Sequence, residues 1–134
     1  MGIAQVEKLD RILELRAEVA ARYEALLAPI EGVETLIADD ADHRRSWFVY
    51  VVLLEESIDR DSVIGRLAEH GVAAKPYLPS IHLQPYYRER FGYREGTLPV
   101  SEAASARSLA LPFSTALAGE DQKRVAESLV RALA

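Results

Sequence analysis

The chain has 134 residues, a net charge of −5 and no cysteine; 49% of its residues are hydrophobic and 28% are charged. This composition is that of an ordinary globular protein, and the length suits one domain that buries about two-thirds of its unfolded surface. The negative charge disfavours binding to a phosphate backbone, the lack of cysteine excludes disulfides, and no apolar run approaches the roughly 18 residues of a membrane span. Charged residues interrupt the N-terminal stretch where a signal peptide is apolar, so we expect a cytoplasmic protein.

The first predicted element is an amphipathic helix over residues 3–28. Its apolar residues recur at steps of three and four, as one face of a helix requires. They are Val6, Leu9, Leu13, Ala20, Tyr23 and Leu27. Pro29 and Gly32 predict the end of the helix. Because neither a cap nor a strand precedes it, this N-terminus is typical of a segment cut from a larger chain.

Two strands are predicted after this helix. Residues 32–37 favour a short edge strand, and the polar loop that follows contains Arg44 and Arg45, which we interpret as solvated side chains rather than anion ligands. Residues 46–54 (SWFVYVVLL) are rich in aromatic and β-branched side chains and are apolar on both faces, which predicts a central strand covered on each side. If this chain covers only one of those faces, the other face requires a partner domain.

The next helix is predicted to begin after Asp59, a favoured N-cap residue, with Ile58 and Val63 placed to form a hydrophobic staple. Gly71 predicts the end of this helix. Residues 72–74 (VAA) are expected to return as a short strand. The buried side of the helix is predicted to carry Val63, Ile64 and Leu67.

Residues 75–92 (KPYLPSIHLQPYYRERFG) concentrate prolines, aromatic rings and basic side chains. Proline restricts its own backbone and that of the residue before it, which predicts a stiff loop over residues 75–84. Pro85 suits the first position of a short helix, and Gly92 suits the position just after its end.

The C-terminal third predicts two more helices and an extended segment. Pro99 suits the first turn of a helix, and residues 109–114 are expected to be extended around Pro112. The last helix is predicted over residues 119–133, with Val125, Leu129 and Leu133 on its inner face. The whole pattern predicts a single α+β domain over residues 1–134, with a small, mostly antiparallel sheet backed by helices.

The stiff loop is the first candidate for a functional site. A rigid loop that carries Lys75, Tyr77 and His82 is how a scaffold usually presents functional side chains. The alternative is that the tyrosine is a packing ring and that His82 only pins the loop through a backbone hydrogen bond. Other chemistries have weaker support, because His43, His70 and His82 lack the spacing of a zinc site and Ser80 lacks a glycine-rich nucleophile turn.

Segment 86–94 suggests a different class of function, a stand-alone binding module. It interleaves aromatic and basic residues, a combination that is typical of contacts with single-stranded nucleic acid or with a protein partner. The residues are Tyr86, Tyr87, Arg88, Arg90, Tyr93 and Arg94. The net charge of −5, together with Glu89 and Glu95, makes nucleic acid the less favoured partner.

Four blocks of the sequence resemble the C-terminal small domain of the DegT/DnrJ/StrS-type sugar aminotransferases, which use pyridoxal phosphate (PLP). The blocks are GIAQVEKLD, RSWFVYVV, KPYLPSIHLQPYYRERFG and GTLPVSEAASARSLALPF, and they occur in the family's order. Ser80 departs from the pattern, since a proline commonly stands there. The resemblance implies the small domain of a fold-type I PLP-dependent transferase, with the catalytic PLP-binding large domain absent from these 134 residues.

The same resemblance implies roles for particular residues. Tyr77 and His82 would face the active-site cleft of an intact enzyme, and Lys75 would lie near a phosphate of the nucleotide-sugar substrate. The family's cofactor lysine lies in the large domain, and Lys8 and Lys123 are expected to be solvated. We therefore expect no catalytic, metal-binding or PLP-binding residue in this chain, no transamination by the chain alone, and exposed apolar surface that favours a homodimer.

Overall fold

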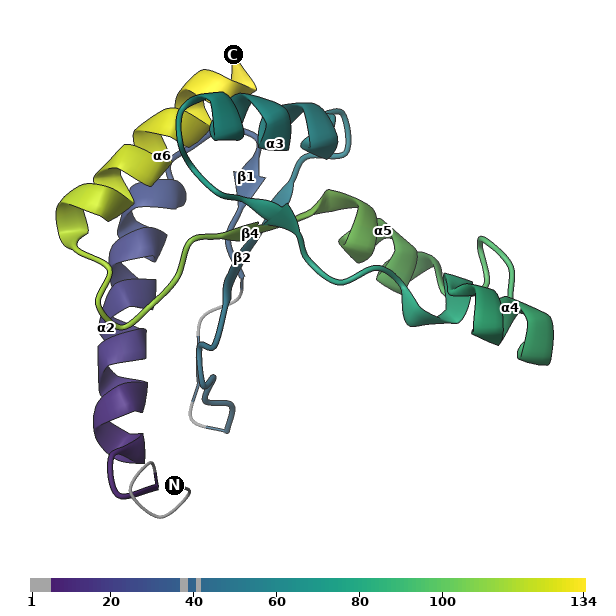
Figure 1. The fold of residues 1–134 in the computed structure, drawn as a ribbon, viewed down its shortest axis with the longest axis horizontal. Helices are drawn as coiled ribbons and strands as arrows, with labels where there is room; N and C mark the ends of the chain where they lie inside the picture. The colour runs from purple at the N-terminus through teal and green to yellow at the C-terminus, as the bar shows by residue number, and fades with distance from the viewer. Residues whose placement is uncertain (1–5, 37–38, 41) are drawn as a thin grey trace.

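The computed structural model describes residues 6–36, 39–40 and 42–134. Within these residues, four short strands form one sheet in the order β1–β2–β4–β3, and every neighbouring pair is antiparallel. The strands are β1 (Val33–Glu34), β2 (Tyr50–Leu54), β3 (Lys75–Pro76) and β4 (Ser108–Leu111). Helices α2 (Leu9–Leu27), α3 (Arg60–Glu69) and α6 (Gly119–Leu133) pack on one face of the sheet (Figure 1). The predicted α+β fold with a small antiparallel sheet is confirmed.

Between β3 and β4 the chain forms an arm, residues 77–107, that extends away from the helices (Figure 1). The arm contains the 3₁₀ turn η1 (Ile81–Leu83) and the helices α4 (Pro85–Phe91) and α5 (Pro99–Arg107). Pro85 and Pro99 each begin a helix as predicted, because the first N–H groups of a helix have no partner within it and proline lacks that group. Gly92 ends α4 in the left-handed region, with φ of 71°.

The core lies between the helices and one face of β2. Tyr50, Val52 and Leu54 alternate along the strand and are buried on the helix side. They belong to one cluster with the buried helix residues Tyr23, Leu27, Val63, Leu67, Val125 and Leu129, and Leu133 packs against its edge. The predicted inner faces of α3 and α6 are therefore confirmed.

The first helix contributes to the core only through its second half. Residues 3–5 of the predicted helix lie outside the described residues, and α2 runs from Leu9 to Leu27. Val6 is 69% exposed and Leu9 is also exposed, so the predicted buried stripe is wrong at its N-terminal end. The reason is that α6 meets α2 further along, where the buried Gln122 amide donates to the Val19 carbonyl at 2.9 Å.

The first two strands are shorter than the sequence predicts. The edge strand predicted over 32–37 is only Val33–Glu34, and Ile37 lies outside the described residues. The strand predicted over 46–54 begins at Tyr50, because Trp47 has φ of 47° and this left-handed backbone cannot continue a strand. Its central position, between β1 and β4, is confirmed.

The two faces of β2 are covered differently. Helices lie on the side of Tyr50, Val52 and Leu54, whereas Val51 and Leu53 border a groove on the opposite side. The expected cover is complete on the helix side, and on the other side Val51 is buried while Leu53 is half-buried. This second side carries a groove instead of a layer of helices, and we call it the open face.

Helix α3 has the predicted ends. The Asp59 side chain accepts a hydrogen bond from the Asp61 N–H at 3.1 Å, which caps the first turn. At the other end Gly71 has φ of 73°, its N–H donates to the Ala68 carbonyl, and the Val72 N–H donates to the Leu67 carbonyl. These two bonds form a Schellman motif.

The short strand predicted at residues 72–74 is wrong in position. The Val72 N–H is already used to close α3, and pairing with β4 begins only at Lys75, opposite Ala110. Pro76 follows in the same strand, which is possible because β3 lies at the edge of the sheet and needs no donor on its outer side.

Gly65 inside α3 and Gly71 just after it give a matched test of the C-terminal end of this helix. Gly71→Ala is expected to lower the free energy of unfolding by about 1–2 kcal/mol, because an L-residue is strained at its positive φ. Gly65→Ala, inside the same helix with nothing near its added Cβ, is expected to raise it by up to about 1 kcal/mol. Urea denaturation measures both. Equal effects of the two substitutions would contradict the assigned Schellman geometry.

Candidate functional site

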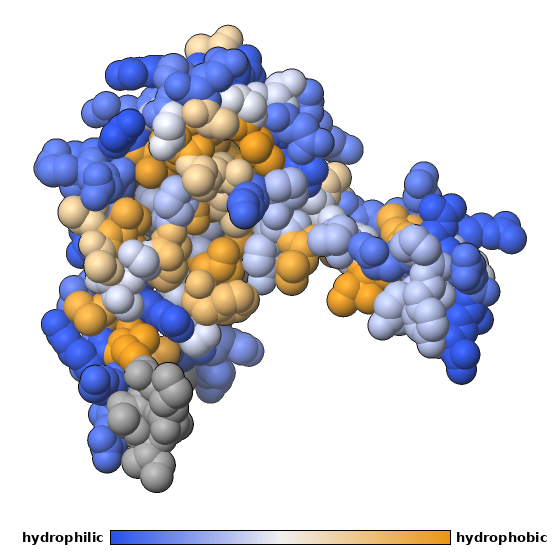
Figure 2. All heavy atoms as spheres, in the orientation of Figure 1, coloured by the Kyte–Doolittle hydropathy of each residue, from blue (hydrophilic) through white to orange (hydrophobic). Residues whose placement is uncertain are grey.

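The open face of the sheet carries a groove of about 1020 Å³. Its floor is formed by Val51 and Leu53 of β2 with Ser108 of β4, and its sides by the segment before β2 and by the arm. Most of its lining is apolar, and Phe48, Leu78 and Ile81 are exposed there. Figure 2 shows hydrophobic side chains where the arm joins the rest of the molecule and along the arm. The exposed apolar surface expected from the sequence is thus present.

Serine side chains hold the wall of the groove in place. Ser108 Oγ donates to the Tyr77 carbonyl at 3.4 Å, and Ser105 Oγ donates to the Leu78 carbonyl at 3.2 Å. In the opposite direction, Ser80 Oγ donates to the Ser101 carbonyl at 3.2 Å. The sequence interpretation missed these contacts, although serines at 101, 105 and 108 lie at the spacing of one helix face.

A carboxylate on α5 joins three parts of the arm. Glu102 Oε1 lies 2.9 Å from His82 Nε2 and accepts the Leu98 N–H at 3.0 Å, while Oε2 accepts the Gly96 N–H at 2.8 Å. The His82 ring is only 5% exposed and stands edge-on to the Tyr93 ring. The alternative in which His82 pins the loop through a backbone hydrogen bond is wrong, since its partner is this side chain. Nothing in the sequence pattern identified Glu102.

These contacts change the acidity of Glu102. The Gly96 N–H, the His82 ring and the Leu98 N–H, in that order of importance, each stabilise the ionised carboxylate and lower its pKa below the ordinary value of 4.5. The ionised form is therefore the one that holds the arm together.

The candidate residues Tyr77, His82 and Lys75 occupy different positions. Tyr77 and His82 both line the groove, with Tyr77 half-buried. Lys75 is exposed on the edge strand and does not line the groove. It lies opposite Ala110, which in turn lies opposite Val51, so Lys75 stands on the open face of the sheet but beyond the groove.

Arginine 45 is not the freely solvated side chain that the sequence suggested. Its Nη1 lies 3.2 Å from Asp39 Oδ1, its backbone N–H donates to the same carboxylate, and its guanidinium lies 5.1 Å from the centroid of the Trp47 ring. Arg45 and Trp47 both line the groove, so one rim carries a cation paired with a carboxylate. Arg44 is exposed, as expected.

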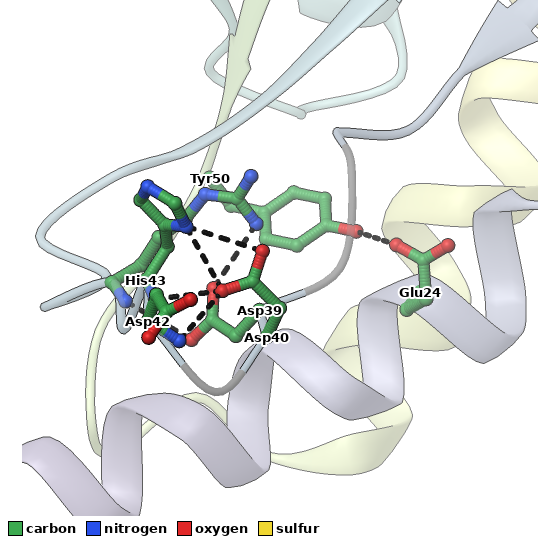
Figure 3. Close-up of polar contacts among 7 residues, drawn as sticks. Glu24, Asp39, Asp40, Asp42, His43 and Tyr50 are labelled. Carbon is green, nitrogen blue, oxygen red and sulfur yellow. Dashed lines mark hydrogen bonds and ion pairs between the residues drawn. The ribbon is translucent and has the colours of Figure 1, made fainter.

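The loop before β2 gathers charged side chains away from the groove floor. Figure 3 shows Asp39, Asp40, Asp42 and His43 close together, and His43 Nδ1 lies 2.9 Å from Asp40 Oδ1. The Tyr50 hydroxyl points the other way and donates to Glu24 at 3.1 Å. Among the described residues, no group of three or more histidine and acidic side chains is arranged to hold a metal ion.

A PLP site of this family would need a lysine in an enclosed position to form the Schiff base. All three lysines lie in the described part of the chain: Lys8 and Lys75 are exposed, and Lys123 Nζ pairs with Glu120 on α6 at 2.8 Å. None of them lines the groove. This arrangement does not fit a Schiff-base lysine, so no reaction step through the cofactor follows from this chain. No helix within residues 6–36 and 42–134 is long and apolar enough to cross a membrane.

The binding-module alternative receives no support from segment 86–94. Its rings pack on one another: Tyr86 on Tyr87 at 5.4 Å, Tyr87 on Phe91 at 6.0 Å and Phe91 on Tyr93 at 5.9 Å between centroids. The Arg90 guanidinium lies over the Phe91 ring at 5.7 Å. A stacking platform for bases needs rings that project separately, whereas Phe91, although 56% exposed, contacts Tyr87, Tyr93 and Arg90.

The fold is one found in solved sugar aminotransferases, and sequence comparison agrees. Residues 1–130 match the DegT/DnrJ/EryC1/StrS aminotransferase family, and the chain belongs to that family. It is 29% identical over 133 residues to the spore coat polysaccharide biosynthesis protein SpsC of Bacillus subtilis, covering 96% of this chain and 34% of SpsC.

Solved structures of aminotransferases share the fold of this chain. The aminotransferase TlmJ from Streptoalloteichus hindustanus is 30% identical with a TM-score of 0.84, and the match covers 98% of this chain and 34% of TlmJ. DesI, solved in the presence of its TDP-sugar product, is 31% identical with a TM-score of 0.79 over 98% of this chain and 33% of DesI. The chain therefore spans about a third of the length of these relatives.

The lowered pKa of Glu102 predicts how the arm responds to acid. A carboxyl whose pKa is lower in the folded state contributes stability above its unfolded pKa and loses it as the pH falls through the folded value. The difference in urea midpoint between the wild type and Glu102→Gln is therefore expected to be largest near pH 7 and to shrink below about pH 4.5.

The matched control for that measurement is Glu89→Gln, on the exposed α4. It is expected to show no pH-dependent difference from the wild type. A constant gap between the wild type and Glu102→Gln from pH 7 to pH 3 would refute the assigned role of the ionised carboxylate.

Proposed function

We propose that this chain is the small domain of a PLP-dependent aminotransferase that acts on a nucleotide-linked keto-sugar, and that its groove forms the substrate side of the active-site cleft. The observation that carries the proposal is the apolar, open face of β2, on a chain that belongs to the family and spans about a third of its relatives. An apolar strand face of this kind needs a cover, and a larger domain that holds PLP would supply it.

In this proposal PLP is bound by a larger domain outside these 134 residues. One relative, Spr1654 from Streptococcus pneumoniae, was solved in a PLP-form, with a TM-score of 0.87 and 21% identity, which shows a shared fold. Bound PLP supplies the electron sink for amino transfer, and residues outside these 134 would hold it. In this division of work the chain itself binds and orients the sugar and excludes water from the cleft.

The groove gives each candidate residue a specific task in the proposal. Tyr77 presents a phenol that can hydrogen-bond a sugar hydroxyl, and His82 adds a second polar group to an otherwise apolar wall. Lys75, on the same face but beyond the groove, is placed to attract a diphosphate that extends out of it.

The same proposal includes a homodimer and a cytoplasmic location. The arm carries exposed apolar residues, and Val6 and Leu9 are exposed near the start of α2, which favours a homodimer in the assembled enzyme. The enzyme is proposed to work in the cytoplasm, in the synthesis of amino sugars.

Trp47 allows a direct test of the groove, because it is the only tryptophan and it lines the groove. Titration with TDP-glucose is expected to change its fluorescence in a saturable way. Tyr77→Phe is expected to weaken binding about three- to tenfold, the usual effect of losing one hydrogen bond. Tyr86→Phe, outside the groove, is expected to leave the affinity unchanged. Equal affinities of both variants, or no response of Trp47, would count against the proposed cleft.

The lysines provide a second, independent test. On addition of PLP, no stoichiometric internal-aldimine absorbance is expected from this chain, since none of Lys8, Lys75 and Lys123 lines the groove. The spectrum of the wild type is compared with that of Lys75→Ala. A one-to-one band that disappears in Lys75→Ala would overturn the assignment of the cofactor lysine to another domain.

A further inference from the structure

Glu102 fixes which nitrogen of His82 carries a proton. Two of its three partners, the Gly96 and Leu98 N–H groups, are backbone donors that can only donate. The carboxylate that receives them is an acceptor, so the third contact, 2.9 Å to His82 Nε2, requires an N–H on that nitrogen. In the neutral ring the proton therefore sits on Nε2, and Nδ1 is left with a lone pair.

The position of His82 determines where Nδ1 is available. The ring is 5% exposed and lines the groove, and its edge-on contact with the Tyr93 ring, at 6.0 Å, restricts its rotation. Within the described residues no protein group bonds to Nδ1, yet no buried side-chain nitrogen there lacks a partner. Nδ1 thus has solvent-accessible surface, on a residue that lines the groove.

We propose that Glu102 is a positioning residue, which holds His82 as the Nε2–H tautomer and so presents Nδ1 in the groove as a hydrogen-bond acceptor for a hydroxyl of the bound sugar. This inference rests on the proposed function and adds a specificity element to it. A hydrogen-bond acceptor in an apolar wall weakens the binding of ligands that have no hydrogen-bond donor at that position. Such a ligand displaces water from Nδ1 and leaves it unpaired, which costs more free energy than one hydrogen bond contributes.

The same chain contains a matched control pair. His43 also bonds an aspartate, Asp40, that accepts backbone N–H groups, but through Nδ1 and on an exposed loop outside the groove. Asp40→Asn removes that carboxylate without touching the groove. The two pairs use opposite ring nitrogens, so one spectrum of the full chain reports on both.

The first measurement is a proton–nitrogen NMR spectrum of histidine-labelled full chain, with His82 assigned from His43→Gln and His70→Gln. The expected result is a slowly exchanging ring proton on Nε2 of His82, which Glu102→Ala abolishes and Asp40→Asn leaves in place. A ring proton on Nδ1 of His82, or no protected ring proton in the wild type, would overturn the positioning role.

The second measurement separates the two nitrogens by substitution. Glutamine approximates Nε2 of histidine and asparagine approximates Nδ1. His82→Gln is expected to keep amide protection at Gly96 and Leu98 but to bind TDP-glucose about tenfold more weakly, with TDP affinity unchanged. His82→Asn is expected to lose that protection. Wild-type affinity of His82→Gln for TDP-glucose would eliminate the acceptor role.

Failure of the proposed function gives a different result. If neither TDP-glucose nor TDP alters Trp47 emission in the wild type, the nucleotide-sugar cleft is refuted, and the acceptor role is refuted with it. The position of the ring proton is decided by the unliganded spectrum alone, so the role of Glu102 in orienting His82 is then judged separately.

Discussion

Strand β2 imposes the constraint on which the rest of the structure depends. Side chains alternate along a strand, and this one is apolar at every position from Tyr50 to Leu54, so both of its faces need apolar cover. The helices satisfy one face completely. The other face, with Val51 and Leu53, borders a groove that the arm only partly encloses. The helix side of the sheet is thus fully packed, whereas the groove side has no layer of helices over it.

The arm is held by a different kind of interaction from the core. No described residue of α5 is buried, and its contacts with the preceding loop run through serine hydroxyls and backbone carbonyls. Hydrogen bonds of this kind contribute about 1 kcal/mol each and are open to competition from water. The core, by contrast, buries large side chains such as Leu54 and Leu129. The floor of the groove is therefore supported by the packed core, whereas its arm-side wall is held by hydrogen bonds.

Sequence reasoning succeeded where the signal was local. Asp59 and Gly71 bracket α3, and Pro85 and Gly92 bracket α4, because capping and left-handed backbone are properties of one or two residues. It failed where a backbone group that the sequence assigned to the sheet makes a different hydrogen bond in the structure. The Val72 N–H closes a helix instead of joining the sheet, and no composition rule predicts that choice. Glu102 was missed for a further reason: its partner His82 is twenty residues away, and their pairing exists only once the arm has folded back.

The arm also has a topological property of its own. It leaves the sheet at the end of β3 and returns at the start of β4, and these two strands are paired neighbours. Its ends are therefore pinned side by side, as in a long excursion from a hairpin, and a segment inserted in that way can be lengthened or exchanged at little entropic cost to the remainder. In evolution, such an attachment point allows the arm to change in sequence or length while the supporting sheet and helices stay the same.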